Sequence, residues 1–182
     1  NKKIELQNLV NENRYFKSEN EYLKKIIDDH NTFSKNFHLT KVLIDNQSPY
    51  LKSIIISKGF NHGIKKGVAV KDKFFFVGKI VSVNYLTSRV LLASDLNSKI
   101  PIIIEPGNIN AILSGNGNNE YAELEFLPKQ NSISEGNIVF TSGADAIIPA
   151  AIPVGIIFEK DGKKFVRFYS DFTQLKYVKV SK

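Results

Sequence analysis

The sequence predicts a mainly β protein: two small six-stranded β-barrel domains preceded by an N-terminal coiled-coil helix. Three observations support this fold class. Residues 1–36 contain no proline or glycine, whereas all 11 glycines and all six prolines follow them. From Phe37 onward, short runs of β-branched and aromatic residues alternate with turn signals. Many short strands leave sheet edges to protect, and closure into barrels protects them.

A heptad repeat in residues 1–36 places apolar residues on one helical face. We call this face the seam, and it is the expected dimer interface. It consists of Leu6, Leu9, Asn13, Phe16, Asn20, Leu23 and Ile27. A surface helix that packs on its own domain is the alternative interpretation.

Two features of the heptads favour a parallel homodimer. Asn13 and Asn20 occupy a positions, where an asparagine can pair with its twin and fix the register. Glutamates at g positions precede lysines at e positions by five residues, as in Glu12 and Lys17. This spacing brings opposite charges together only if the helices run parallel. Each exposed pair contributes less than about 1 kcal/mol, so the charges select orientation more than they add stability.

The β part divides into two groups of six expected strands. The first group is 42–46, 50–57, 68–71, 74–83, 88–94 and 100–104. The second group is 109–114, 121–127, 138–141, 154–159, 164–169 and 174–180. Asn116-Gly117 and Asp161-Gly162 predict type I′ hairpin turns, which need positive φ at both central residues.

The expected domains are residues 1–36 for the coiled-coil dimerisation helix, 37–107 for the first barrel and 108–182 for the second barrel. The proposed boundary is at Pro106-Gly107, because proline and glycine mark connections. Exchange of the last strand between the barrels is left open.

Composition limits the classes of function. The chain has no cysteine, which excludes disulfides and thiol nucleophiles, and a net charge of +7 permits anionic partners without requiring them. No apolar run is long enough to cross a bilayer. Because methionine is absent, Asn1 is not expected to be a native start, and a preceding N-terminal piece is expected.

Catalytic residues are scarce in the sequence. Ser142 and Asp145 could belong to a triad only by borrowing His62 or His38, and no G-x-S-x-G surrounds Ser142. No metal-ligand spacing occurs, so we expect no catalytic site, metal or cofactor. A trypsin-like double-barrel protease remains the alternative from the enzyme class.

Aromatic residues beside basic ones offer a second alternative, an OB-like nucleic-acid-binding module. Phe74, Phe75 and Phe76 follow Lys73, and they are also a candidate partner surface. Consecutive strand residues point to opposite faces, so at least one of these rings lies outside its barrel's core. It is either buried between the barrels or exposed to a protein partner.

Several segments taken together resemble the bacterial rod-shape-determining protein family MreC. The most specific match is a T-S-G…P-x-G-I-P-V-G signature, here Thr141, Ser142, Gly143, Pro149, Ile152, Pro153, Val154 and Gly155. Further matches, in the same order as in the family, are Lys58-Gly59, Gly63, Lys66-Gly67-Val68, Val77-Gly78-Lys79-Ile80, Ser94-Asp95, Asn97-Ser98, Ile100-Pro101 and Asp171-Phe172. The resemblance covers nearly the whole β part.

One letter departs from the signature. Ala151 stands where the family usually has glycine before Ile152. We therefore expect that position 151 does not need positive φ in this chain.

The resemblance implies a non-catalytic scaffold of the cell-elongation machinery. Family members are anchored in the inner membrane by an N-terminal helix, and their coiled coil and two barrels are periplasmic. The implied partners are a second copy in a parallel homodimer or polymer, the membrane protein MreD, MreB filaments through the missing N-terminus, and the elongation transpeptidase (a class B penicillin-binding protein) with its glycosyltransferase. Nucleic acid is not among them.

Overall fold

The computed structural model describes residues 2–31, 37–43, 51–128 and 132–181, and the side chains of these residues except 2–5 and 24–31. The chain divides into two units, residues 1–35 and 36–182.

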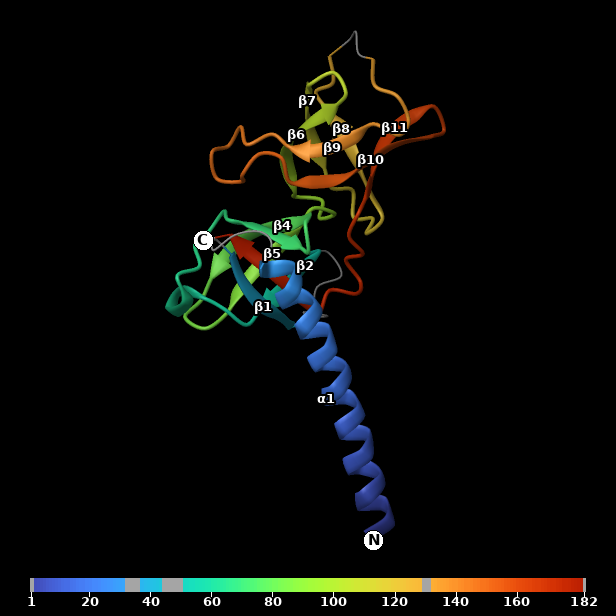
Figure 1. The fold of residues 1–182 in the computed structure, drawn as a ribbon. Helices are drawn as coiled ribbons and strands as arrows, with labels where there is room; N and C mark the ends of the chain where they lie inside the picture. Colours follow the sequence, from blue (N-terminus) through green and yellow to red (C-terminus); the bar gives the residue numbers. More distant parts are fainter. Residues whose placement is uncertain (1, 32–36, 44–50, 129–131, 182) are drawn as a thin grey trace. The chain divides into compact units, whose positions relative to one another are not determined.

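In its described residues the first unit is one helix, α1 (Lys2–Asn31), drawn in blue in Figure 1. Its leucines, lysines and glutamates have good helix propensity, and no proline or glycine interrupts it. The expected N-terminal helix is confirmed. None of the helices in the described ranges is both long and apolar enough to cross a membrane.

Within the described residues, the second unit is built of twelve strands that form two closed barrels of six. Every pairing between neighbouring strands is antiparallel. The mainly β class with two six-stranded barrels is therefore confirmed.

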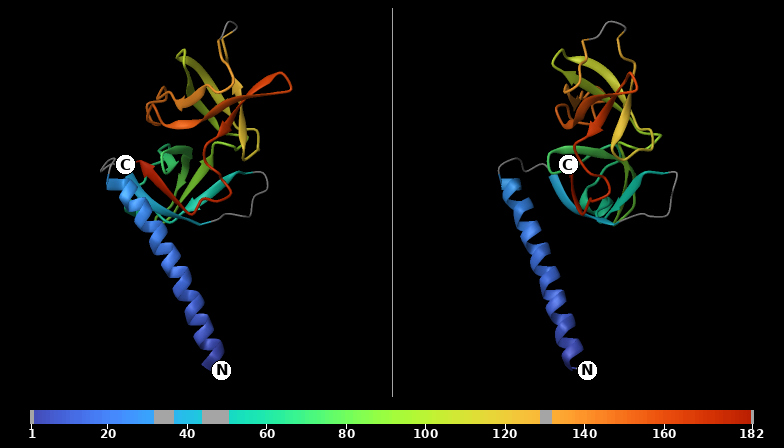
Figure 2. Two further views of the ribbon diagram at one scale, coloured as in Figure 1. Left: turned by 45° about the vertical axis from the view of Figure 1, so that its right-hand side comes forward. Right: turned by 90° about the vertical axis from the view of Figure 1, so that its right-hand side faces the viewer.

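The first barrel is closed by the last strand of the chain. Its order is β1 (Phe37–Leu43), β12 (Tyr177–Ser181), β3 (Ala69–Asp72), β4 (Phe75–Val83), β5 (Ser88–Leu92) and β2 (Ser53–Ile56). The 3₁₀ turn η1 (Phe60–His62) lies between β2 and β3. The C-terminus accordingly lies at the first barrel in both Figure 1 and Figure 2. Val70, Phe76, Ile80, Val90 and Val180 are fully buried in its core.

The second barrel uses a continuous stretch of sequence. Its order is β10 (Pro153–Lys160), β11 (Lys163–Phe168), β8 (Tyr121–Glu125), β7 (Ile109–Ser114), β6 (Lys99–Glu105) and β9 (Ile138–Thr141). Fully buried side chains from four of these strands fill its core: Ile102, Ile104, Leu113, Val139 and Val166. Strands β4 and β10, one from each barrel, contact each other.

Strand pairing divides the β part differently from the expected boundary at residue 107. β6, expected in the first barrel, pairs with β7 and β9 of the second, and β12 belongs to the first barrel. Pro106-Gly107 is therefore the turn between β6 and β7. The chain passes from the first barrel to the second through residues 93–98 and returns through residues 169–176, and neither connection contains proline or glycine.

Hydrogen bonds hold the connection at residues 93–98. The carboxylate of Asp95, a fully buried residue, accepts the backbone N–H groups of Lys52 at 2.6 Å and Asn97 at 2.7 Å. On the other side, the N–H of Gly117 donates to the Ser94 carbonyl at 2.8 Å. A carboxylate that satisfies backbone donors therefore holds the connection, which does not lie at the expected Pro106-Gly107 boundary.

One hairpin is built twice, once in each barrel. In the first barrel, Gly67 has φ of 91°, its N–H donates to the Ile80 carbonyl at 2.7 Å, and the Ile80 N–H donates to the Val68 carbonyl at 2.9 Å. These bonds fix the start of β3 against β4.

The second barrel repeats this arrangement. Gly136 has φ of 89°, its N–H donates to the Ile157 carbonyl at 2.9 Å, and the Ile157 N–H donates to the Asn137 carbonyl at 2.8 Å. β9 and β10 therefore correspond to β3 and β4. The first hairpin has two residues between its strands, whereas the second has residues 142–152.

The two predicted type I′ turns have different outcomes. Asp161 and Gly162 have φ of 53° and 72°, which confirms positive φ at both positions. At Asn116-Gly117 only Gly117 has positive φ, so that prediction is wrong. The Asn116 side chain instead accepts the Asn118 N–H at 3.0 Å, a local bond that builds a longer loop.

Candidate functional site

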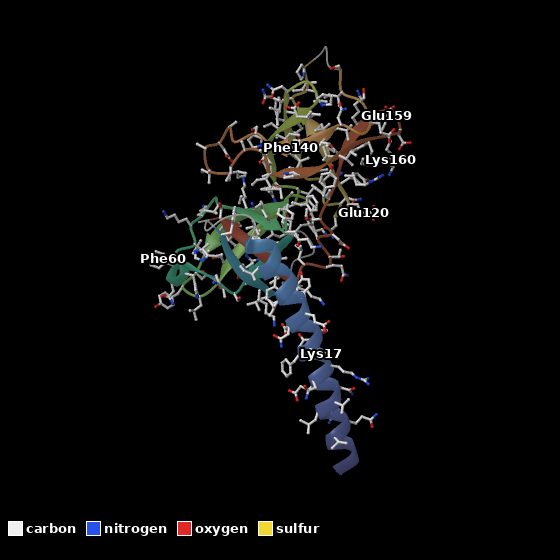
Figure 3. All side chains as sticks on the ribbon, in the orientation of Figure 1. Lys17, Phe60, Glu120, Phe140, Glu159 and Lys160 are labelled. Atoms are coloured by element: carbon white, nitrogen blue, oxygen red, sulfur yellow. The ribbon has the colours of Figure 1, made fainter. Side chains whose placement is uncertain are left out.

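The seam of α1 presents large apolar side chains to solvent within the first unit. Leu6, Leu9 and Phe16 are 67%, 54% and 51% exposed. Asn13 and Asn20 are also exposed, and Leu23 is half-buried. The side chain of Ile27 lies outside the described residues. Lys17, labelled in Figure 3, marks the charged flank of the seam.

The signature loop, residues 141–155, is held at its ends by one buried side chain. The Thr141 hydroxyl donates to the Pro149 carbonyl at 2.6 Å and accepts the Ile152 N–H at 3.0 Å. The Thr141 carbonyl accepts the Ala151 N–H at 2.9 Å. A hydroxyl donates and accepts at once, so threonine closes the loop where the isosteric valine could not.

Ser142 and Asp145 serve the same loop. The Ser142 hydroxyl accepts the Ala144 N–H at 3.3 Å, and the Asp145 carboxylate accepts the N–H groups of Ile147 at 3.2 Å and Ile148 at 2.9 Å. These are turn-forming bonds.

The histidines considered for a triad lie in the other barrel. His38 is on β1, and His62 is in η1, where its Nδ1 accepts the Gly59 N–H at 3.4 Å. Among the described side chains, Ser142 and Asp145 bond to the backbone of their own loop, while His38 and His62 belong to elements of the first barrel.

The expectation that position 151 does not need positive φ is wrong. Its φ is 63°, in the left-handed region, although glycine is replaced here by alanine. The backbone conformation is imposed by the Thr141 bonds on both sides of it, from Pro149 and Ile152. A Cβ in this region costs about 1–2 kcal/mol, so the chain carries local strain at this position.

The loop also reaches the first barrel. A Cβ placed on Gly67 would lie 2.9 Å from Cγ2 of Ile147, so the Ile147 side chain packs directly on the Gly67 backbone. The loop that carries Ile147 also contains Gly143, whose φ of 76° favours glycine. Two segments that carry the family resemblance thus meet in space.

The three phenylalanines of the candidate partner surface have three different environments. Phe76 is fully buried in the first barrel, which removes it from that surface. Phe75 packs against the Tyr169 ring, with centroids 5.0 Å apart. Phe74 is exposed, and Lys179 Nζ lies 5.6 Å from its ring centroid. Alternation along the strand explains the difference between Phe75 and Phe76.

Charged residues beside these rings have shifted pKa values. Burial lowers the pKa of Lys71, and the neighbouring charge of Lys179 lowers it further. Burial raises the pKa of the Asp72 carboxyl, while Lys73 acts in the opposite direction. Desolvation disfavours the charged form of each group.

One surface was not predicted from the sequence. We call it the Phe60–Tyr85 patch, and it consists of Phe60, Tyr85 and Leu86, with Lys65 and Lys66 at its rim. All five side chains are exposed. A signal was available, because Phe60 stands beside a glycine and Tyr85-Leu86 occupies a turn between two expected strands. Apolar residues in turns are not needed for a barrel core.

Comparison with known proteins gives consistent similarities. A family model described as "Rod shape-determining protein MreC, barrel core" matches residues 42–182. The cell shape-determining protein MreC of Cereibacter sphaeroides is 34% identical over 145 residues, which cover 79% of this chain and 48% of that protein. The chain thus spans about half the length of this relative.

Solved structures agree on the fold. A structure named MreC superposes with a TM-score of 0.80 at 26% identity and covers 92% of this chain and 99% of that one. A complex between a penicillin-binding protein and MreC from Helicobacter pylori matches with a TM-score of 0.55 at 15% identity, covering 80% of this chain and 99% of that one. At that identity the similarity shows the fold alone.

Proposed function

This chain belongs to the MreC family of rod shape-determining proteins, and from that premise we propose that it is a non-catalytic scaffold of the cell-elongation machinery. It maintains rod shape by dimerising and by organising or activating peptidoglycan synthases. The supporting facts are the names of its relatives and the surfaces described above.

The observation that carries the proposal is the exposed seam of α1. Burying a side chain such as Leu6, Leu9 or Phe16 in a dimer contributes about 1.5–3 kcal/mol each, whereas leaving it in water contributes nothing. Asn13 and Asn20 at a positions lower the stability of the coil but restrict it to one register. The seam therefore favours a specific dimer of modest stability.

The proposed orientation is parallel. Glu12 at g lies five residues before Lys17 at e, and Glu19 lies five before Lys24. In a parallel pair each glutamate faces a lysine of the second copy, whereas an antiparallel pair sets like charges together. A parallel dimer directs both β parts to the same end of the coil.

We place the β part in the periplasm, with an N-terminal membrane helix as anchor. The proposed partners are the membrane protein MreD, MreB filaments on the cytoplasmic side, and the elongation transpeptidase with its glycosyltransferase. The Helicobacter complex contains MreC together with a penicillin-binding protein, which supports a synthase as partner. Phe74, exposed beside Lys179, remains a candidate contact for it.

The proposed mechanism is positional. A scaffold can activate a synthase only by binding its active conformation more tightly than its inactive one. The described surfaces supply binding groups rather than reacting groups.

Light scattering tests the seam. The chain 1–182 is expected to be a dimer, and the unit 37–182 a monomer. Phe16→Lys is expected to give monomers because it buries a lysine at a d position of the seam. Its matched control is Tyr15→Lys, a neighbouring exposed aromatic at a c position, which should remain dimeric.

Equal oligomeric states for 1–182 and 37–182 would show that the seam is not the interface. Equal effects of Phe16→Lys and Tyr15→Lys would mean that helix hydrophobicity, and not the heptad, controls association.

A further inference from the structure

Two neighbouring loops of the first barrel expose three large apolar side chains. Phe60, Tyr85 and Leu86 are 73%, 67% and 57% exposed. Phe60 belongs to η1, and the other two belong to the turn between β4 and β5. Figure 3 shows Phe60 at the outer edge of the first barrel. Exposed apolar residues gathered at one place and rimmed by polar groups mark an interaction surface.

The backbone beneath the Phe60–Tyr85 patch is fixed. The Phe60 N–H donates to the Asn84 carbonyl at 2.9 Å, and the Asn61 N–H donates to the Tyr85 carbonyl at 3.0 Å. A Cβ at Gly59 would lie 2.1 Å from the Asn84 carbonyl oxygen, so glycine permits this close approach. A patch held in this way loses little conformational entropy when it binds a partner.

A pocket lies between the two loops. Phe60 and Tyr85 line it together with Val83 and the buried Ile64, and Lys65 and Lys66 also line it. Aliphatic walls with two aromatic rings suit a single inserted apolar side chain.

The two segments that border the pocket carry charge of one sign. Lys65 and Lys66 are exposed, and residues 58–67 and 82–89 contain no aspartate or glutamate. The rim therefore attracts carboxylates and repels basic segments.

We propose that the Phe60–Tyr85 patch binds an acidic protein segment that inserts one aromatic or aliphatic side chain into the pocket. Carboxylates of the segment face Lys65 and Lys66, while its inserted side chain contacts Ile64 and Val83. The partner is thus defined by chemistry: an apolar anchor flanked by aspartate or glutamate.

Other anionic partners fit less well. Single-stranded nucleic acid needs a flat ring on which bases stack, whereas these rings border a pocket with aliphatic walls. An anionic membrane would receive a protruding apolar tip and would not need a pocket. A protein segment uses both the pocket and the charge.

The Phe60–Tyr85 patch adds a partner site to the proposed scaffold, and none of its residues belongs to the seam. A monomeric Phe16→Lys chain should therefore bind the same segment as the dimer does. Failure of the seam proposal and failure of the patch proposal are consequently distinguishable.

Phage-displayed random peptides, selected on the whole chain, provide the test. The expected selected peptides combine aspartate or glutamate with one aromatic or leucine residue. Their synthetic forms should bind Phe60→Ser/Tyr85→Ser and Lys65→Glu/Lys66→Glu variants at least about tenfold more weakly, as for loss of a binding hot spot.

Lys160→Glu/Lys163→Glu is the matched control, because it changes net charge equally at the exposed turn of β10 and β11. It should bind like the original chain, and all variants should keep its thermal unfolding temperature. Selected peptides without acidic residues, or peptides that bind both double-lysine variants equally, would overturn the proposal. So would absence of any enriched peptide, or binding at the patch of only oligothymidylate or phosphatidylglycerol vesicles.

Discussion

The hairpin β3–β4 of the first barrel and the hairpin β9–β10 of the second are the same structure with different turns. Each begins at a glycine with φ near 90°, and each has the same pair of backbone hydrogen bonds. The first closes with two residues, whereas the second carries the signature loop. A barrel can therefore be built without the signature loop, and the residues of this loop serve another purpose.

That purpose is visible in the contacts of the loop. Thr141 fastens the two ends of the loop together, and Ile147 packs on Gly67 of the first barrel. Gly67 is the glycine that begins the shorter hairpin. The longer hairpin thus packs on the start of its own counterpart, which links the two barrels through equivalent structures.

The largest expected effect concerns the glycines shared by the two hairpins. A Cβ at Gly78 would lie 2.1 Å from the Leu91 carbonyl oxygen, and one at Gly155 would lie 2.0 Å from that of Arg167. Gly78→Ala and Gly155→Ala should each destabilise their own barrel by about 3 kcal/mol or more, at the upper end of overpacking. Hydrogen exchange, followed separately in residues 53–92 and 99–168, measures this.

Gly162→Ala is the control for these variants. Nothing lies within 4 Å of its Cβ, and φ is 72°, so only the backbone cost of about 1–2 kcal/mol applies. A small effect at Gly78 together with a large one at Gly155 would show that the two hairpins are not equivalent.

The second prediction separates the loop from the hairpin that carries it. Thr141→Val keeps the side-chain shape but leaves the Ile152 N–H and the Pro149 carbonyl without their partner. We expect a loss of about 1–3 kcal/mol in the free energy of unfolding, measured by urea denaturation.

Thr40→Val in β1 is the comparison for that loss. Thr40 is also buried, and the contact that the described residues show for its hydroxyl is a long one of 3.4 Å with that of Ser57, so the variant should lose less. Equal losses at both threonines would mean that the loop bonds contribute nothing beyond burial of a hydroxyl.

The smallest expected effect is an increase in the free energy of unfolding. Ala151→Gly should stabilise the chain by about 0.5–1 kcal/mol, because it removes a Cβ from a residue with positive φ and this gain exceeds the added entropy of the unfolded chain. Ala150→Gly, at a neighbouring exposed position without positive φ, should destabilise it slightly. Thermal unfolding distinguishes the two, and destabilisation by Ala151→Gly would refute strain at this residue.

Local patterns account for what could be predicted. The strands and the two barrels follow from alternating apolar residues and turns, and the helix follows from the absence of proline and glycine. The signature was also recognisable in order along the chain. These features depend on residues close in sequence.

Features that depend on distant residues could not be predicted. The connection at residues 93–98 contains turn-forming Ser, Asp and Asn residues, but nothing nearby in sequence shows that it joins two barrels, because Asp95 holds it through Lys52, far away in sequence. The positive φ of Ala151 is imposed by Thr141, and no property of alanine indicates it. Each loop of the Phe60–Tyr85 patch has an apolar residue in a turn, which the sequence shows, but their joining into one patch depends on loops that meet only in the folded barrel.

The position of β12 sets the order in which the two barrels can be completed during synthesis. A chain emerging from the ribosome can complete the second barrel as soon as Phe168 is available, but the first barrel lacks the strand between β1 and β3 until Tyr177–Ser181 is made. The domain synthesised first is therefore finished last, the reverse of the usual N-terminal-first order. A chain that stops before Tyr177 would keep its later-made barrel and lose its earlier one, so β12 couples the first barrel to synthesis of everything that precedes it.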